Sequence, residues 1–132
     1  MANNPMLAPA SAGVVRRAHF GDQQLLRVVA AASTNSSLVK GAAAGTLEEL
    51  ALFNTTAAAI YVKFYDKATA PTVGTDAPAF TLQIPANGSV IIGSSLGKPF
   101  ANGIGYGITG AAADSDTTAV TAGSITGYLL WS

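Results

Sequence analysis

The sequence predicts an all-β protein, an antiparallel β-sandwich of jelly-roll type with a flexible N-terminal arm. Short apolar runs recur at spacings of roughly 8 to 15 residues, which is typical of sandwiches and barrels. Gly, Asn, Pro, Asp and Thr separate the runs, and no stretch has the periodicity of a long helix. The 132 residues correspond to one domain. We therefore assign residues 1–12 to the arm and residues 13–132 to a single β-sandwich domain.

The N-terminal third of the chain contains the arm and three apolar runs. The arm, MANNPMLAPASA, contains two prolines and no periodic apolar pattern, as in segments that become ordered on a partner. The runs VVRRAHF at 14–20 and QQLLRVVAAA at 23–32 predict strands, although one or two helical turns remain an alternative for the second. The run TLEELALFN at 46–54 is short for a helix and predicts a strand.

The middle of the chain contains the clearest alternation. The segment IYVKFY at 60–65 alternates strictly and predicts a half-buried strand, as does AFTLQIP at 79–85. Between them, TAPTVGTDAP at 69–78 consists of turn-forming residues and predicts a long surface loop without an apolar face. Ile60, Val62 and Phe64 are expected to point into the core, and Phe80, Leu82 and Ile84 share one face of their strand.

The last third contains a turn signal and two further strands. The dipeptide Asn87-Gly88 between two apolar runs predicts a β-hairpin, because both residues tolerate positive φ. In IGYGITG at 104–110 large side chains alternate with glycines, and a glycine face lets another backbone or a large side chain approach closely. After a polar loop, ITGYLLW at 125–131 predicts the final strand.

Charged residues are scarce. Seven Lys and Arg balance seven Asp and Glu, and together these residues make up 11% of the chain, against about 25% in typical soluble domains. Without clustered cations the chain lacks the electrostatic footprint expected for nucleic acid or an anionic membrane. No apolar run reaches the roughly 20 residues of a membrane helix. A mostly neutral exterior is instead typical of a subunit that packs against other subunits.

No motif predicts catalysis. His19, the one histidine, has no nucleophile or acid beside it. The segments Ser37–Lys40 and Ser95–Lys98 match S-x-x-K, but the pattern requires a helical turn that neither segment predicts. GYGITG at 105–110 matches the dinucleotide-binding pattern only formally, because its glycines lie within a predicted strand. We therefore expect no enzyme, no catalytic residue and no cofactor.

Asp114 and Asp116 are the candidate cation ligands. Calcium takes six to eight oxygen ligands, and the rest of an EF-hand loop is missing here. We expect a solvated turn and no metal site, and a cation at this loop remains the alternative.

Four aromatic residues form a candidate interface: Tyr61, Tyr65, Tyr106 and Trp131. Tyrosine and tryptophan are enriched at protein interfaces. The alternative is a platform on which sugars or bases stack. The low charge of the chain favours the interface.

Two stretches of the chain resemble a known group of proteins. They are LFNTTAAAIYVKFYDKATAPTVGTDAPAFTLQIPANGSV at 52–90 and GIGYGITGAAADSDTTAV at 103–120. Over residues 33–132 the chain resembles a group of small tailed-bacteriophage proteins found among virion structural genes. The resemblance implies a non-enzymatic component of a phage particle, located in the virion.

The resemblance assigns no location on the particle, but a neutral β-sandwich with a mobile arm suits a virion subunit, and sandwiches and jelly rolls recur in capsid proteins. We therefore expect a head decoration, or cement, protein on the capsid surface. Its expected partners are the major capsid protein and copies of itself, with a trimer favoured and the arm lying across a neighbour. The alternative is a tail, fibre or baseplate module that binds host glycans through Tyr61 and Tyr65. We expect neither nucleic acid nor a membrane as a partner.

Overall fold

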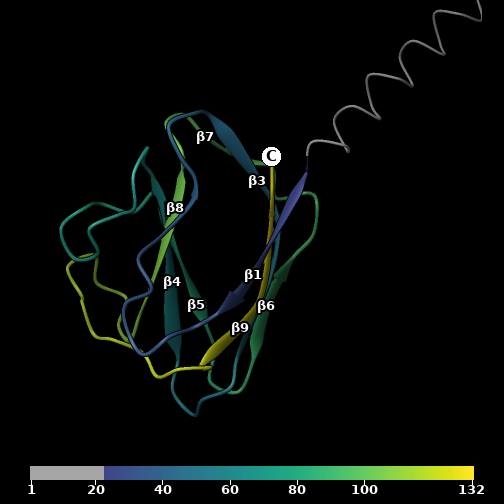
Figure 1. Ribbon diagram of the computed structural model, residues 1–132. Coiled ribbons are helices and arrows are strands. Elements are labelled where there is room, and N and C mark those ends of the chain that lie inside the picture. The colour runs from purple at the N-terminus through teal and green to yellow at the C-terminus, as the bar shows by residue number, and fades with distance from the viewer. Residues whose placement is uncertain (1–22) are drawn as a thin grey trace, which may run out of the picture.

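The computed structural model describes residues 23–132, which form nine β-strands in two antiparallel sheets (Figure 1). The arm expected at residues 1–12 and the strand expected at 14–20, which contains His19, lie outside the described residues. The strands are β1 (Gln24–Val29), β2 (Ser37–Lys40), β3 (Gly45–Asn54), β4 (Ile60–Asp66), β5 (Phe80–Ile84), β6 (Ser89–Ile92), β7 (Lys98–Phe100), β8 (Ile104–Thr109) and β9 (Ile125–Trp131).

The strand order is that of a jelly roll. Sheet A has the order β1-β9-β3-β6, with β7 also paired to β3, and sheet B has the order β2-β8-β4-β5. When β7 is set aside, the antiparallel pairs are nested: β1 with β9, β2 with β8, β3 with β6 and β4 with β5. Nested pairs of this kind arise when one long antiparallel hairpin folds over so that its strands are divided between two sheets. The predicted β-sandwich is confirmed, and the second apolar run is strand β1 rather than a helix.

The core lies between the two sheets and follows the predicted alternation. The three inward residues of β4 are buried, and so is Ile84 in β5, while Phe80 and Leu82 pack against the core at its margin. The Phe64 and Phe80 rings stack with centroids 4.9 Å apart. Further core residues come from β3, β8 and β9: Leu47, Leu50, Leu52, Ile104, Tyr106, Ile108, Ile125 and Leu129.

The turn at Asn87-Gly88 forms, but the predicted hairpin is wrong. Asn87 has a φ of 49°, and the Gly88 N–H donates to the Pro85 carbonyl at 3.0 Å. However, β5 pairs with β4 in sheet B and β6 pairs with β3 in sheet A, so the turn carries the chain between sheets. Its backbone is bonded to the end of β3 instead, with Asn54 N–H donating to the Gly88 carbonyl and Asn87 N–H to the Thr56 carbonyl, both at 2.8 Å.

Two loops cover the outer face of sheet B, and Figure 1 shows both on the side away from sheet A. In the loop at 67–79, Pro71 is buried and lies over Gly105, and Val73 lies over Gly107. The expectation that this loop has no apolar face is therefore wrong. The close approach expected at the glycine face of β8 is confirmed, because a Cβ on Gly107 would lie 2.6 Å from Val73 Cγ2.

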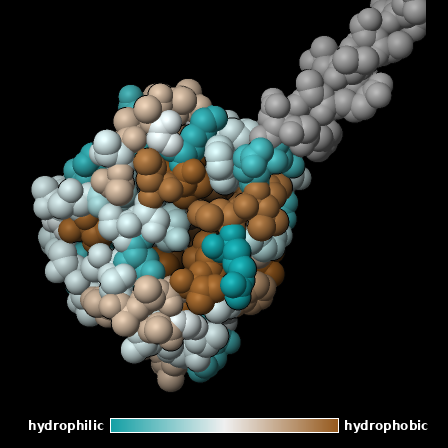
Figure 2. All heavy atoms as spheres, viewed as in Figure 1, coloured by the Kyte–Doolittle hydropathy of each residue, from teal (hydrophilic) through white to brown (hydrophobic). Residues whose placement is uncertain are grey.

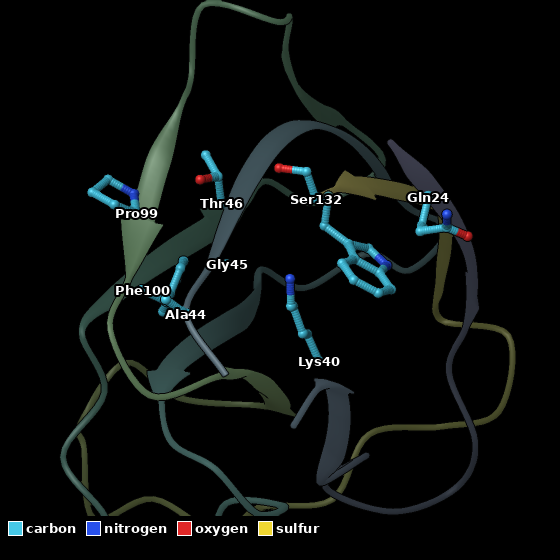
Figure 3. A pocket seen from close by; sticks show the side chains of 9 residues that line it. Gln24, Lys40, Ala44, Gly45, Thr46, Pro99, Phe100 and Ser132 are labelled. Carbon is cyan, nitrogen blue, oxygen red and sulfur yellow. The ribbon is translucent and has the colours of Figure 1, made fainter. Parts of the chain in front are cut away.

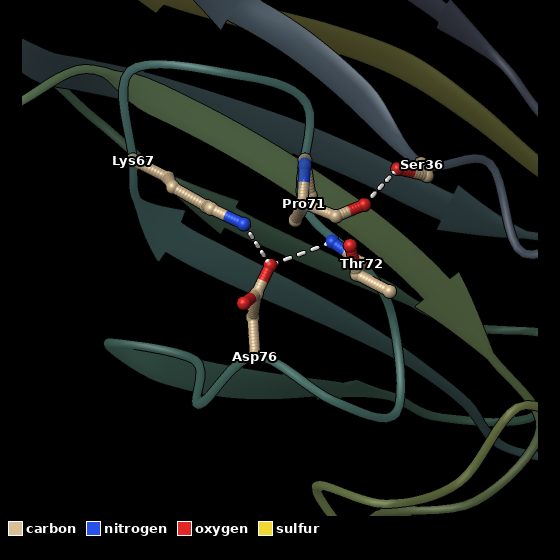
Figure 4. Close-up of polar contacts among 5 residues, drawn as sticks. All are labelled: Ser36, Lys67, Pro71, Thr72 and Asp76. Atoms are coloured by element: carbon tan, nitrogen blue, oxygen red, sulfur yellow. Dashed lines mark hydrogen bonds and ion pairs between the residues drawn. The ribbon is translucent and has the colours of Figure 1, made fainter.

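Polar contacts hold the 67–79 loop in place (Figure 4). Lys67 forms an ion pair with Asp76, and the Thr72 N–H donates to the same carboxylate at 2.6 Å. The Ser36 hydroxyl donates to the Pro71 carbonyl and connects the loop to the start of β2. The second loop, at 110–118, is bonded to the sheet through Lys63, whose ammonium donates to the Ala113 carbonyl at 2.5 Å.

Candidate interaction surface

The outer face of sheet A is exposed and apolar. Among the described residues, five large hydrophobic side chains are exposed, and four of them lie on this face: Leu25 (64%), Val29 (47%), Phe53 (42%) and Ile91 (63%). The fifth, Leu38, lies on sheet B opposite Gly105. We call the outer side of β1, β9, β3 and β6 the apolar face. Figure 2 shows hydrophobic residues gathered over the part of the molecule where Figure 1 places β1, β9 and β6.

Strand register brings these residues together. Side chains directly opposite one another in an antiparallel ladder share a face of the sheet. Because β9 pairs with both β1 and β3, and β3 with β6, the register defines three rows across the face. The rows are Leu25–Leu130–Glu49, Arg27–Tyr128–Ala51–Ile91 and Val29–Thr126–Phe53–Ser89.

The apolar face carries one positive and one negative side chain, so its formal charges cancel. The Tyr128 hydroxyl donates to Glu49 Oε1 at 2.7 Å. This hydrogen bond, with burial and the negative charge of Glu49, raises the pKa of Tyr128. Arg27 has no ion pair there, since the one ion pair among residues 23–132 joins Lys67 to Asp76. A neutral face has no electrostatic means of attracting a charged partner from a distance.

The size of the apolar face suits a protein partner. From the usual strand spacing and residue rise, four strands of this length cover about 20 Å in each direction, or about 400 Å². The largest apolar patch on a typical monomer is about 300 to 600 Å² and is often functional. We therefore treat this face, rather than a catalytic centre, as the candidate functional site.

Two of the four aromatic residues predicted at an interface are buried within the chain. Tyr65 is 1% exposed beneath the 67–79 loop, and Tyr106 is 8% exposed on the inner face of β8. Tyr61 and Trp131 are half-buried. The stacking platform considered as the alternative for Tyr61 and Tyr65 is therefore not formed, because the Tyr65 ring is buried.

The environment of Tyr65 is unusual. Its hydroxyl is buried without a hydrogen-bond partner among the described residues. Burial, and then the negative charges of Asp114 and Asp76, raise its pKa. These effects keep the phenol neutral and do not prepare it for proton transfer at neutral pH.

The other sequence candidates lie apart from the apolar face. Ser37–Lys40 is strand β2, and Ser95 lies in a turn before β7, so neither S-x-x-K segment is helical. GYGITG at 105–110 lies mainly in β8, as expected from its pattern. Among residues 23–132, no three His, Asp or Glu side chains are grouped closely enough to hold a metal ion.

The two aspartates of the 110–118 loop have different roles. Asp116 accepts hydrogen bonds from Ala111 N–H at 3.1 Å and from the Thr118 N–H and hydroxyl at 3.2 and 2.7 Å. These bonds, led by the one from the Thr118 hydroxyl, lower the pKa of Asp116. Asp114 is exposed. The loop is thus held by its own hydroxyl and amide groups and by the Lys63 ammonium.

Sequence reasoning missed the apolar face, although the sequence carries a signal for it. A strand with one covered face alternates, whereas consecutive large apolar residues place apolar side chains on both faces. Such pairs occur in all four strands of the face: Leu25-Leu26, Leu52-Phe53, Ile91-Ile92 and Leu129-Leu130.

Comparison with known proteins gives one structural likeness. No family model and no curated protein matches the chain. The chain is similar to one described as "Structure of infectious bursal disease virus Gx strain", with 14% sequence identity and a TM-score of 0.26. The match covers 83% of this chain and 32% of that one. No helix long and apolar enough to cross a membrane is found in residues 23–132.

Proposed function

We propose that this chain is a non-enzymatic structural protein of a bacteriophage particle, a head decoration (cement) protein that packs its apolar face against the major capsid protein. The observation that carries the proposal is the difference between the two sheets. The chain covers the outer face of sheet B with its own loops and leaves four large hydrophobic side chains exposed on sheet A. The resemblance of residues 33–132 to phage virion proteins supports a place in the phage particle, and the recurrence of jelly rolls in capsid proteins favours the capsid as the partner.

An estimate of the binding energy supports attachment through several copies. The face covers about 400 Å² and also contains polar side chains, so its burial contributes at most about 10 kcal/mol from this chain's side. Association costs about 4 to 15 kcal/mol in lost translational and rotational freedom. One chain alone would therefore bind weakly, whereas linked copies gain avidity without new contacts. We accordingly propose a homotrimer around a local three-fold position of the head, with residues 1–12 lying across a neighbouring subunit.

Immunogold labelling of intact particles, with antibody against the purified protein, tests the location. We expect label spread over the head. Label confined to the tail or its tip would contradict the proposal and favour a tail, fibre or baseplate module. If intact particles carry no label, the labelling is repeated on disrupted particles. The proposal then requires label on the head fragments, and its absence there would contradict the proposal.

Rebinding to heads that lack the protein tests the apolar face. The variants Ile91→Asp and Leu25→Asp place a charge on the face at strongly exposed positions, where substitutions usually change stability by less than about 0.5 kcal/mol. We expect both to lose head occupancy. Leu38→Asp is the matched control, because it makes the same change on sheet B and should leave occupancy intact.

Two results would count against this interface. One is equal loss of occupancy for Leu38→Asp and Ile91→Asp, and the other is full occupancy for both sheet A variants.

Deleting residues 1–12 tests the arm separately: we expect weaker head binding with an unchanged thermal midpoint of unfolding.

A further inference from the structure

A pocket lies at one end of the sandwich, apart from the apolar face. It is a shallow depression, largely open to solvent, with a volume of about 730 Å³. Residues from both sheets line it, including Lys40 at the end of β2, Thr46 near the start of β3, Gln24 at the start of β1 and Trp131 at the end of β9. Figure 3 shows Lys40 extending from β2 towards the chain end at Ser132.

Irregularities in two strands occur at this end of the sandwich. The ladder between β2 and β8 shifts register between Leu38 and Lys40, and the ladder between β3 and β9 shifts between Leu47 and Glu49. Register shifts of this kind are β-bulges, which change the direction of side chains and are over-represented next to functional sites. The first shift immediately precedes Lys40, and the second follows the residue that pairs with Trp131.

Lys40 is held in place on two sides. Its stem lies over Gly45, where an added Cβ would be 2.7 Å from Lys40 Cδ and 2.9 Å from the Ser132 carbonyl oxygen. Its ammonium lies 5.6 Å from the centre of the Trp131 ring, a distance at which a cation is attracted by the aromatic face. The lysine is therefore positioned before any ligand arrives.

The Lys40 ammonium has no carboxylate partner among residues 23–132, where the one ion pair is Lys67 with Asp76. Glu48, the nearest acid along β3, accepts a hydrogen bond from the Ser132 hydroxyl at 2.8 Å and is not part of the pocket lining. The pocket thus offers a positioned cation beside an indole ring, with the Thr46 hydroxyl and the Gln24 amide on its wall.

We propose that this pocket binds an acidic sugar residue of a glycan, with the sugar carboxylate on the Lys40 ammonium. The sugar lies beside the exposed part of the Trp131 indole, next to the Lys40 ammonium, and its hydroxyls bond to Thr46 and Gln24. A flat aromatic ring with hydroxyl and amide groups suits a pyranose. The Lys40 ammonium selects a sugar that carries a carboxylate over a neutral one.

Trp131 makes this proposal directly measurable, since it is the one tryptophan of the chain. The purified protein is titrated with trigalacturonic acid while tryptophan fluorescence is followed. The fully methyl-esterified trisaccharide is the matched probe, because it has the same rings without the negative charges. We expect a saturable change with the acid, affinity lower by about tenfold for the ester, and weaker binding of the acid as salt is raised.

The variant Lys40→Met should reduce affinity for the acid to that of the ester. Lys98→Met is the control, because Lys98 is also half-buried but lies outside the pocket lining. The salt series uses the unaltered protein and so tests the charge contact even if a variant folds poorly. Equal affinity for acid and ester, equal loss in both lysine variants, or the absence of a saturable change would overturn the proposal. A glutamate peptide that competes as well as the trisaccharide would overturn the assignment to a sugar.

Discussion

Gly127 shows how one position controls the centre of sheet A. It lies in β9, which pairs with β1 on one side and β3 on the other. Its φ is +145°, a conformation that side-chain-bearing residues rarely adopt, and an added Cβ would lie 1.9 Å from the Ala51 carbonyl oxygen. The obstacle is backbone of the neighbouring strand, which cannot move without breaking the β3–β9 ladder.

We expect Gly127→Ala to lower the free energy of unfolding by about 3 kcal/mol or more, because overpacking and backbone strain act together. Urea denaturation provides the measurement. Gly93→Ala is the control: nothing lies within 4 Å of its Cβ position, so the change should stay within about 0.5 kcal/mol. Similar values for the two variants would show that the backbone at Gly127 relaxes freely.

The loop at 67–79 acts as an element of the fold, although it contains no strand. It closes over β8 because Gly105 and Gly107 leave room for Pro71 and Val73. The Lys67–Asp76 ion pair lies within this segment and is partly exposed, and ion pairs that remain accessible to water contribute little to stability. Packing of the loop on the glycine face is therefore its main attachment.

A double-mutant cycle measures that packing. Gly107→Ala should destabilise the protein by about 1 to 3 kcal/mol, because the new methyl group meets Val73 Cγ2 at 2.6 Å. Val73→Ala removes the obstructing methyl group, so the double variant should be more stable than the sum of the single changes implies, by about 0.5 kcal/mol or more. Urea denaturation gives the four free energies. Strict additivity would mean that the two side chains do not share this space.

At the scale of the whole molecule, three aspartates accept hydrogen bonds: Asp66 joins the end of β4 to the turn after β7, whereas Asp76 and Asp116 bond within their own loops. Each has a pKa below its ordinary value of 3.8. The leading causes are the Asn102 N–H for Asp66, the hydrogen bond from Lys67 for Asp76 and the hydrogen bond from the Thr118 hydroxyl for Asp116. Each carboxylate is bonded in its charged form, which favours that form.

These shifts predict acid sensitivity. In the unfolded chain the three groups take up protons near pH 3.8, whereas in the folded chain they do so only at lower pH. Their contribution to stability is therefore complete above that pH and is lost as the pH falls through the lowered pKa values. Urea unfolding at a series of pH values should show a level free energy from neutral pH to about 5 and a decline below about 4.

Two neighbouring substitutions test the origin of the decline. Asp116→Asn removes one of the bonded carboxylates and should make the decline shallower. Asp114→Asn, which changes an exposed carboxylate of the same loop, is the control. The account would be wrong if both variants altered the slope equally.

The sequence by itself determined most of the strands and the side chains that share a face, although the short strands β2 and β7 were not predicted. The alternation in β4 predicted its inward residues and that in β5 its shared face, the glycines of β8 predicted a close approach, and Asn87-Gly88 predicted a turn. These features depend on residues near one another in the chain, where a period of two and the allowed values of φ are sufficient.

Only the tertiary structure decided which strands pair and what covers each face. The Asn87-Gly88 turn could have closed a hairpin, but β6 pairs with β3 in the other sheet. Tyr65 alternates as an outward residue, yet the 67–79 loop buries it, while Ile91 stays exposed on sheet A. Alternation assigns side chains to opposite faces without saying what packs on either face. That depends on contacts between residues distant in the chain, so the sheet that is left for a partner can be identified only in the folded molecule.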